Sequence, residues 1–168
     1  MKTSERLRPT IDELKALLAY DPETGIVTYR VKRYRKKAGD LAGFQSGEYL
    51  CIGINQFDYK LHRVAWALHY GEWPSLEIDH INGNGSDNRI VNLRNVTHAQ
   101  NLKNRKTAKN NTTGLKGVYY SKRDKSWSAK IRVDYQWKCL GTFQTKEEAA
   151  EAYETGSVRY HGEFRRAG

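Results

Sequence analysis

Asp79, His80 and Asn101 are the residues of this sequence best suited to carry out chemistry. Asp79 and His80 are adjacent at the expected end of a strand, and Asn101 falls in the first turn of the helix expected after it. If the strand packs on that helix, a carboxylate, an imidazole and an amide oxygen converge. Oxygen ligands of this kind suit Mg²⁺ or Mn²⁺ better than zinc, and His80 is then left to take a proton from water.

The elements that must position these residues are predicted from the same segment. Residues 78–81 and 90–96 have the composition of short strands, residues 82–88 form a loop rich in Asn and Gly, and residues 97–100 have the spacing of a helix-capping box. The predicted order is strand, loop, strand, helix. Adjacent residues of a regular strand point to opposite faces, so only a loop or bulge at the strand end would bring an adjacent carboxylate and imidazole to one site.

The spacing of the polar residues resembles that of a known family. Asp79 and His80, with Asn92 and Asn101 at 12 and 21 residues after His80, are similar to the motif of the HNH, or ββα-metal, nucleases. Two further stretches bring the resemblance closer to the phage and intron-encoded homing endonucleases. They are residues 61–66 (LHRVAW) and 88–94 (NRIVNLR).

This resemblance implies a role for each motif residue. Asp79 and Asn101 would bind one divalent ion, His80 would be the general base for water, and Asn92 would help to hold the hairpin and His80 in place. The motif ends in Asn101 where His is also common, which favours a weak Mg²⁺-type site over a tight transition-metal site. The alternative is that Asp79 and His80 form an ordinary turn and that the asparagines only cap loops.

Several basic residues near the motif are candidates for contacts to phosphate. They are His62, Arg63, His98, Lys103 and Arg105. His62 and Arg63 could equally well pack the small domain. His98, three residues before Asn101, could contact metal or phosphate, or could be an exposed residue of the first helical turn.

The N-terminal part of the chain is predicted to contain short helices and hairpins. Residues 10–20 open with a capping box and predict a helix that runs to the end of this range. Residues 26–31 and 49–54 resemble strands of small antiparallel hairpins, and residues 61–70 predict a second helix.

From residue 117 the pattern indicates a small sheet backed by a helix. The strands are expected at residues 118–120, 127–133 and 138–143. The middle strand alternates, which places Trp127 in the core and turns Lys130 and Arg132 to a polar face. A capping box at residues 145–148 predicts the helix that covers the apolar face.

This C-terminal segment resembles the apetala/ethylene-response-factor (AP2/ERF) type of DNA-binding domain, in which the sheet lies in the major groove. The resemblance implies a DNA-binding face made of Lys116, Tyr119, Lys122, Lys130, Arg132, Trp137, Thr142 and Tyr153. Plant members carry several arginines where this chain has Tyr119 and Tyr120, and Cys139 stands where a tryptophan is common. The target sequence therefore cannot be carried over. The alternative for Lys130 and Arg132 is a solvated strand face.

The fold class predicted for the chain is α+β, with a small ββα-metal (HNH) nuclease module followed by an AP2-type three-stranded antiparallel sheet packed on one helix. Residues 103–116 are basic and nearly free of apolar side chains, as in a linker, and we expect a boundary near Thr112. The predicted parts are an N-terminal α/β-hairpin region of the nuclease (1–60), the HNH core (61–104), a basic linker (105–115) and the AP2-like domain (116–168).

The composition indicates a polyanionic partner. The chain has 29 Lys and Arg against 19 Asp and Glu, a net charge of +10, and its 11% aromatic residues favour nucleic acid over an anionic membrane surface. The basic clusters 30–37 and 103–109 could follow a DNA backbone. No run of about 18 apolar residues and no apolar leader is present, so we expect a cytoplasmic protein, associated with the nucleoid of a bacterial or phage-infected cell. Cys51 and Cys139 are expected to be unpaired structural thiols.

These features predict a Mg²⁺- or Mn²⁺-dependent DNA endonuclease of homing type that acts on double-stranded DNA as a monomer and nicks one strand. The alternative from another class is a non-catalytic, sequence-specific DNA-binding regulator in which the HNH region is only a scaffold. RNA as the substrate is a third, weaker possibility, because the C-terminal sheet resembles a DNA reader.

Overall fold

The structure is a computed structural model that describes residues 8–107 and 110–165. The outer ends of the predicted N-terminal region and AP2-like domain, and residues 108–109 of the predicted linker and of the basic cluster 103–109, lie outside the described residues. The chain divides into two compact units, Met1–Val96 and Thr97–Gly168. The segment predicted as a linker (105–115) belongs to the second unit.

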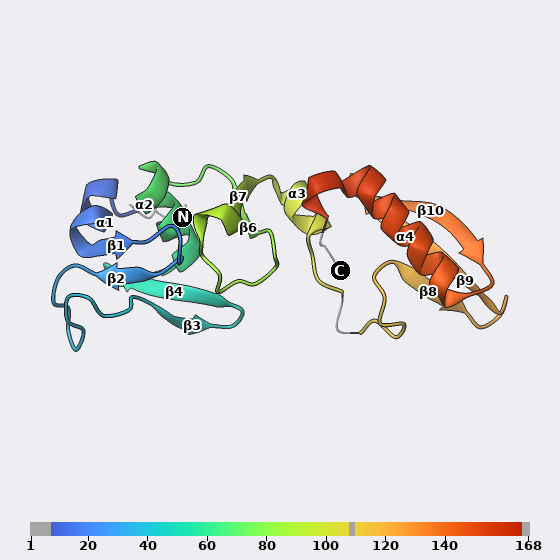
Figure 1. Cartoon of the computed structure of the whole chain (residues 1–168), viewed down its shortest axis with the longest axis horizontal. Helices are drawn as coiled ribbons and strands as arrows, with labels where there is room; N and C mark the ends of the chain where they lie inside the picture. The colour runs from blue at the N-terminus through green and yellow to red at the C-terminus, as the bar shows by residue number, and fades with distance from the viewer. Residues whose placement is uncertain (1–7, 108–109, 166–168) are drawn as a thin grey trace, which may run out of the picture. The chain divides into compact units, whose positions relative to one another are not determined.

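The first unit contains short helices and three small antiparallel sheets (Figure 1). Its elements are α1 (Ile11–Leu17), β1 (Leu18–Tyr20), β2 (Val27–Tyr29), β3 (Phe44–Ser46), β4 (Tyr49–Ile54), β5 (Phe57–Lys60), α2 (Leu61–Tyr70), β6 (Glu77–His80), the 3₁₀ helix η1 (Ile90–Asn92) and β7 (Leu93–Val96). The sheets are β1–β2, β3–β4–β5 and β6–β7. The predicted helix at 61–70 and the predicted strand at 49–54 are confirmed with the same bounds.

The predicted helix over residues 10–20 is too long. The capping box at Thr10 is present, but α1 ends at Leu17 and the next three residues form β1, paired in register from Leu18↔Tyr29 to Tyr20↔Val27. The turn between the strands is closed by the hydrogen bond from Gly25 N to Asp21 O (2.9 Å). A short helix gains little from one more turn, so strand pairing determines the structure here.

The predicted strand over residues 90–96 is also shorter than expected. Residues Ile90–Asn92 form η1, and only Leu93–Val96 pair with β6. The amide of Ile90 donates to Pro22 O (3.1 Å) instead of to a neighbouring strand, and Val91 is 75% exposed. Contacts to the 21–25 turn therefore replace strand pairing at the start of this segment.

The core of the first unit lies between its helices and the β4 strand. Leu14 of α1, Ile52 and Ile54 of β4, and Leu61 and Val64 of α2 are buried together. Ala67 of α2 belongs to the same cluster, and Ala65 from this helix packs with Ile78 and Leu93 of the β6–β7 hairpin. Helix α2 thus connects the small sheets to the hairpin that carries Asp79 and His80.

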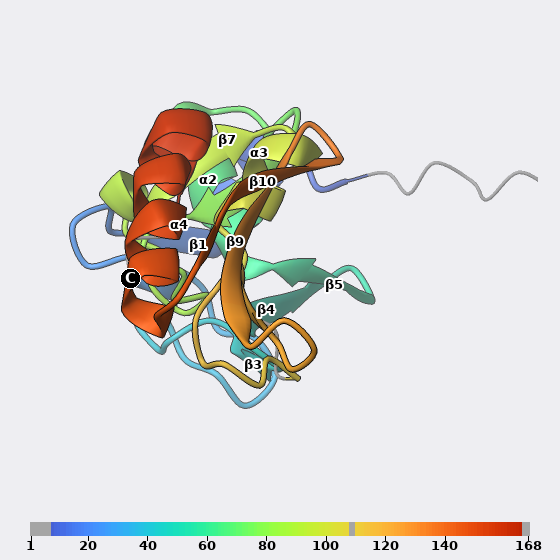
Figure 2. The same cartoon turned by 90° about the vertical axis from the view of Figure 1, so that its right-hand side faces the viewer.

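The second unit contains a three-stranded antiparallel sheet packed on one long helix, as predicted. Its elements are α3 (His98–Lys103), β8 (Val118–Ser121), β9 (Ser126–Val133), β10 (Gln136–Phe143), α4 (Lys146–His161) and the 3₁₀ helix η2 (Gly162–Phe164), with strand order β10–β9–β8. Figure 2 shows α4 lying along one side of this sheet.

The alternation predicted for β9 is confirmed. Ala129 and Ile131 are buried, whereas Lys130 and Arg132 are exposed. Val118, Ala129 and Ala149 form the buried core between sheet and helix, and the partly buried Trp127 packs against it. The capping box that opens α4 is also present.

Cys51 is buried in β4 and Cys139 is exposed on β10, and both are free thiols. Among the described residues, no helix is both long and apolar enough to cross a membrane.

Candidate active site

His80 is the last residue of β6 and is 4% exposed. The pairing of β6 with β7 runs without a bulge through Asp79↔Arg94 and His80↔Leu93. Asp79 and His80 have different hydrogen-bond partners in this hairpin, as expected from the alternation of side chains along a strand, and their convergence on one site remains a prediction.

Asp79 forms an ion pair across the hairpin. Its Oδ2 accepts hydrogen bonds from Nε (2.9 Å) and Nη2 (2.7 Å) of Arg94, and the Asp79 side chain is 8% exposed. The two residues are direct cross-strand partners, which places both side chains on the same face. The carboxylate is therefore held in a fixed orientation by the neighbouring strand.

His80 has a hydrogen-bond partner in the loop that follows its strand. Its Nε2 lies 3.2 Å from Oδ1 of Asn88, which is itself 1% exposed. A carbonyl oxygen only accepts, so Nε2 is the donor and the lone pair of the neutral ring is on Nδ1. Burial lowers the pKa of His80, and the Asn88 contact opposes that shift in part.

Two further rings pack around His80. His62 of α2 lies edge-on to it, with ring centroids 4.9 Å apart, and Tyr49 of β4 lies 5.4 Å from His62 and 5.9 Å from His80. Burial, and secondarily the nearby His80, lower the pKa of His62 to about 3. Nδ1 of His62 is buried without a hydrogen-bond partner among the described residues. We call Tyr49, His62, His80 and Asn88 the histidine cluster.

The loop that carries Asn88 is held by side-chain and backbone hydrogen bonds. Asn92 accepts from the amide of Asn82 (3.0 Å) through Oδ1 and donates to Asp87 O (2.8 Å) through Nδ2. The hydroxyl of Tyr20 donates to Asn88 O (2.8 Å). The two hydrogen bonds of Asn92 are those expected of a residue that holds the hairpin loop, which is the role implied by its position in the motif.

Two glycines let neighbouring segments approach this loop closely. A Cβ on Gly25 would lie 2.4 Å from Arg89 N, and Gly25 has a φ of 74°. A Cβ on Gly85 would lie 2.2 Å from Glu48 O. Both distances are far below van der Waals contact, so the 21–25 turn and the β3–β4 turn pack directly on the backbone of the loop.

The other predicted phosphate contacts lie in different surroundings. His62 is 6% exposed and belongs to the histidine cluster. Arg63 donates to the carbonyls of Leu76 (2.9 Å) and Pro74 (3.1 Å). The remaining residues, His98, Lys103 and Arg105, belong to the second unit, as does Asn101 on α3. A shared site of Asn101 with Asp79 remains a prediction.

The side chains implied as metal ligands are chemically suited to a divalent ion. Asp79 and Asn101 offer oxygen atoms, which Mg²⁺ and Mn²⁺ prefer. Ligating carboxylates are usually hydrogen-bonded in turn, so the Arg94 contact is compatible with a ligand role for Asp79. Within residues 8–107 and 110–165, no group of three or more His, Cys, Asp or Glu side chains is placed to hold an ion.

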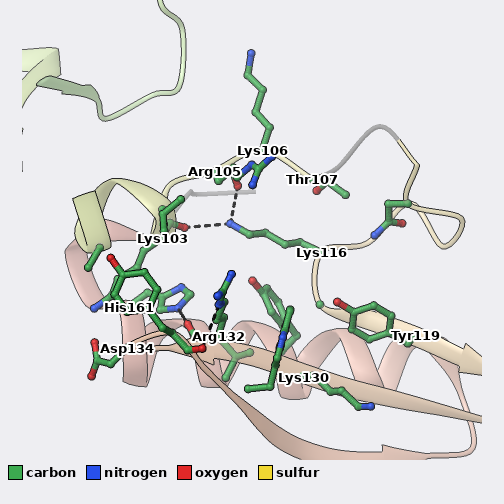
Figure 3. A pocket seen from close by; sticks show the side chains of 18 residues that line it. Lys103, Arg105, Lys106, Thr107, Lys116, Tyr119, Lys130, Arg132, Asp134 and His161 are labelled. Carbon is green, nitrogen blue, oxygen red and sulfur yellow. Dashed lines mark hydrogen bonds between the residues drawn. The ribbon is translucent and has the colours of Figure 1, made fainter. Parts of the chain in front are cut away.

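Most residues of the predicted DNA-binding face line one pocket of the second unit (Figure 3). They are Lys116, Tyr119, Lys130, Arg132, Trp137 and Tyr153. Tyr153 projects from α4 and is partly buried, which raises its pKa to about 12. Lys122 and Thr142 are exposed but do not line this pocket.

The sequence interpretation did not identify Asn88 and Tyr49 as site residues. Asn88 lies within the stretch that carries the family resemblance, but residues 82–92 include four asparagines, and nothing in their spacing distinguishes Asn88. Tyr49 is 31 residues before His80, and only the folding of β4 against α2 and the hairpin brings it close.

The family model described as HNH endonuclease matches residues 59–103 of the chain. The matched segment contains α2, the β6–β7 hairpin and α3, with all four motif residues. Protein 3.8 of Escherichia phage T7 is 33% identical over 108 residues, which cover 64% of this chain and 88% of the phage protein. No solved structure matches the chain.

Proposed function

The chain belongs to the same family as Protein 3.8 of Escherichia phage T7 and carries an HNH endonuclease domain at residues 59–103, and from this premise we propose that it is a site-directed DNA endonuclease of the homing type. It hydrolyses a phosphodiester bond with His80 as the general base. The observation that carries the proposal is the buried His80, oriented by Asn88, inside the HNH domain.

The geometry of His80 supports a role as the general base. Burial lowers its pKa, so the ring is neutral at neutral pH and can accept a proton. Since Nε2 donates to Asn88, the proton of the attacking water passes to Nδ1. His62 and Tyr49 pack against the ring and restrict its rotation, which keeps Nδ1 in one orientation.

A divalent ion is part of the proposal, and Mg²⁺ or Mn²⁺ fits the oxygen donors. Asp79 and Asn101 would hold it. The ion supplies positive charge to the phosphate oxygens, on which negative charge develops during hydrolysis. In this arrangement, Arg94 orients the carboxylate of Asp79 through two hydrogen bonds.

The second unit is proposed to select and anchor the DNA as an AP2-like module. What supports this is the three-stranded sheet on one helix and the exposed Lys130 and Arg132 of its middle strand. The basic clusters 30–37 and 103–109 add affinity for the DNA backbone that does not depend on sequence. Since one HNH site in a monomer reaches one strand per binding event, the product is a nick.

A non-catalytic DNA-binding regulator is the second candidate. The ion pair between Asp79 and Arg94 favours it, because this carboxylate already has a cationic partner within the hairpin. In that case the HNH domain is only a scaffold, and DNA binding is independent of metal.

Cleavage of supercoiled plasmid DNA that carries a target site tests the proposal. With Mg²⁺ the protein is expected to convert the plasmid to the nicked form, and His80→Ala is expected to lower the rate by roughly 10²- to 10⁴-fold with DNA binding unchanged. His69→Ala is the matched control, because His69 lies exposed on α2 outside the histidine cluster. Unchanged cleavage by His80→Ala, with the fold checked by circular dichroism, would contradict the mechanism.

A further inference from the structure

The second unit contains a pocket of about 340 Å³ that the proposed cleavage reaction does not use. One wall is formed by α3 and the segment after it, residues 99–107, and the other by the end of β9 and the turn that follows, residues 130–135. Figure 3 shows Lys103 and Arg105 on the first side and Lys130 and Arg132 on the second. Ligand pockets in proteins have volumes of about 300–1,000 Å³, so this one fits a small ligand or a single group of a larger one.

The charge of the lining is strongly one-sided. Six basic side chains and a single acidic one contribute to it. The basic residues are Lys103, Arg105, Lys106, Lys116, Lys130 and Arg132, and the acidic residue is Asp134. Such a concentration of positive charge around a concave surface attracts an anion and disfavours a neutral or cationic ligand.

Aromatic rings provide most of the remaining surface. Trp137 is 61% exposed, Tyr135 is 58% exposed and Tyr119 is 43% exposed, and all three line the pocket. An exposed aromatic ring gains stacking energy when a planar ring covers it. The lining therefore offers faces for a planar ring beside charges for an anion.

Internal hydrogen bonds hold the walls in place. Nζ of Lys116 donates to the carbonyls of Lys103 (3.0 Å) and Arg105 (2.6 Å), as the dashed lines in Figure 3 show. On the other wall, Nε2 of His161 donates to Arg132 O (2.9 Å), and the Arg132 guanidinium lies 5.8 Å from the centre of the Tyr135 ring. The pocket is thus largely formed before a ligand arrives, which lowers the entropic cost of binding.

A nucleotide combines the two features that the pocket recognises, a planar base and a phosphate. An inorganic phosphate would leave the aromatic faces unused, and a base that is stacked inside a duplex cannot enter a concave site. Unpaired bases, in contrast, stack readily on aromatic side chains. We propose that this pocket binds one unpaired nucleotide of a DNA strand, with its base on the aromatic faces and its phosphate at the lysine and arginine side chains.

This assignment rests on the proposed function to the extent that DNA is the partner, but it goes beyond cleavage. The protein would prefer DNA with an unstacked nucleotide near the bound site over a perfect duplex. Specificity would then depend on how easily a base leaves the stack.

Two neighbouring tyrosines provide a matched pair of variants. Tyr119 and Tyr120 are consecutive on β8 and are 43% and 46% exposed, but only Tyr119 lines the pocket. Dissociation constants are measured by fluorescence anisotropy for two duplexes of equal length and sequence, one of which has an additional unpaired nucleotide. The unpaired position carries 2-aminopurine, whose emission falls when it stacks on an aromatic ring.

The wild-type protein is expected to bind the duplex with the unpaired nucleotide about tenfold more tightly and to quench its emission. Tyr119→Leu is expected to lose both the preference and the quenching, whereas Tyr120→Leu keeps them. Lys130→Ala, at an exposed position, is expected to weaken the preference without unfolding the unit.

Equal affinity of the wild-type protein for the two duplexes, together with plasmid cleavage that depends on His80, would overturn the pocket assignment and leave the proposed function intact. Preference for the unpaired nucleotide without any plasmid cleavage would overturn the proposed endonuclease function and leave the pocket assignment intact. Displacement of the DNA by an equal concentration of a deoxynucleoside monophosphate would overturn the assignment in favour of a free nucleotide. Displacement by polyglutamate, but not by perfect duplex, would overturn it in favour of an acidic peptide.

Discussion

The histidine cluster of the first unit and the basic pocket of the second unit both combine nitrogen-bearing side chains with aromatic rings, but their burial is opposite. In the histidine cluster, His80 and His62 are 4% and 6% exposed. In the basic pocket, Trp137 and Tyr135 are 61% and 58% exposed, and six Lys and Arg side chains contribute to the lining.

The difference in burial matches the two roles proposed for these regions. A general base must be neutral and fixed in one orientation, and burial next to a second neutral imidazole favours both conditions. A binding site for a polyanion needs charged groups, which are costly to bury and therefore remain near solvent. Burial therefore suits the general base proposed for the first unit, and exposure suits the DNA-binding pocket proposed for the second.

The largest effect that would separate the two regions is expected from removal of divalent ions. EDTA should abolish plasmid cleavage, because the proposed chemistry needs a cation at the phosphate, and should leave DNA binding by the basic pocket within about twofold of its original affinity. Cleavage and binding are measured on the same DNA. Cleavage that persists in EDTA would contradict the proposed metal dependence. DNA binding without cleavage under all conditions would favour the non-catalytic regulator.

A large effect on stability is expected from the titration of His62. In the folded state its pKa is lowered to about 3, whereas the unfolded chain takes up a proton near the ordinary value of 6.5. The unfolded state therefore binds more protons, and the free energy of unfolding of the first unit falls by about 4 kcal/mol as the pH drops from 6.5 toward 3.

Urea unfolding at a series of pH values measures this dependence. His62→Leu should reduce it, and His69→Gln, a substitution at an exposed position of the same helix, should leave it in place. An undiminished pH dependence in His62→Leu would show that His62 is not the origin of the acid sensitivity.

A smaller effect on cleavage is expected for Asn88→Ala. Without the Oδ1 acceptor, His80 loses the partner that fixes its tautomer, so the rate should fall by roughly tenfold to a hundredfold, part of what a positioned base contributes. DNA affinity should not change. Asn84→Ala, an exposed residue of the same loop, is the control for plasmid nicking. Equal rates of plasmid nicking in the two variants would show that Asn88 does not position His80.

The smallest effect is expected in the salt dependence of DNA binding. The logarithm of the binding constant falls with the logarithm of salt concentration by about 0.9 per neutralised phosphate. Lys130→Ala in the basic pocket should reduce this slope by about 1, and Lys60→Ala, whose Nζ lies 4.7 Å from the Tyr49 ring centre beside the histidine cluster, should not. The reverse result would place the main DNA contact in the first unit.

Local patterns were sufficient to predict most elements of the fold. The capping boxes at Thr10, Thr97 and Thr145 are all present, α2 and β4 have their predicted bounds, and β9 alternates as predicted. Each of these features depends on residues a few positions apart. The predictions were wrong at residues 18–20 and 90–92, where pairing with β2 and a hydrogen bond to Pro22 involve segments elsewhere in the chain.

The sequence predicts which residue types form the candidate site but not their contacts. The resemblance to the HNH motif implies His80 as the general base and Asn92 as its support, and both roles remain predictions. The register of the β6–β7 hairpin determines that Asp79 meets Arg94, 15 residues later in the chain. No periodic pattern contains that information, because a shift of one residue would pair Asp79 with a different neighbour.

The sequence by itself determined the order of short elements, the positive charge and the HNH motif, because these depend on composition and on spacing along one segment. Only the tertiary structure decided that His80 is buried between Tyr49, His62 and Asn88, and that six basic side chains surround a pocket with exposed aromatic faces. The physical reason is that burial and pocket shape arise when segments distant in the chain pack together.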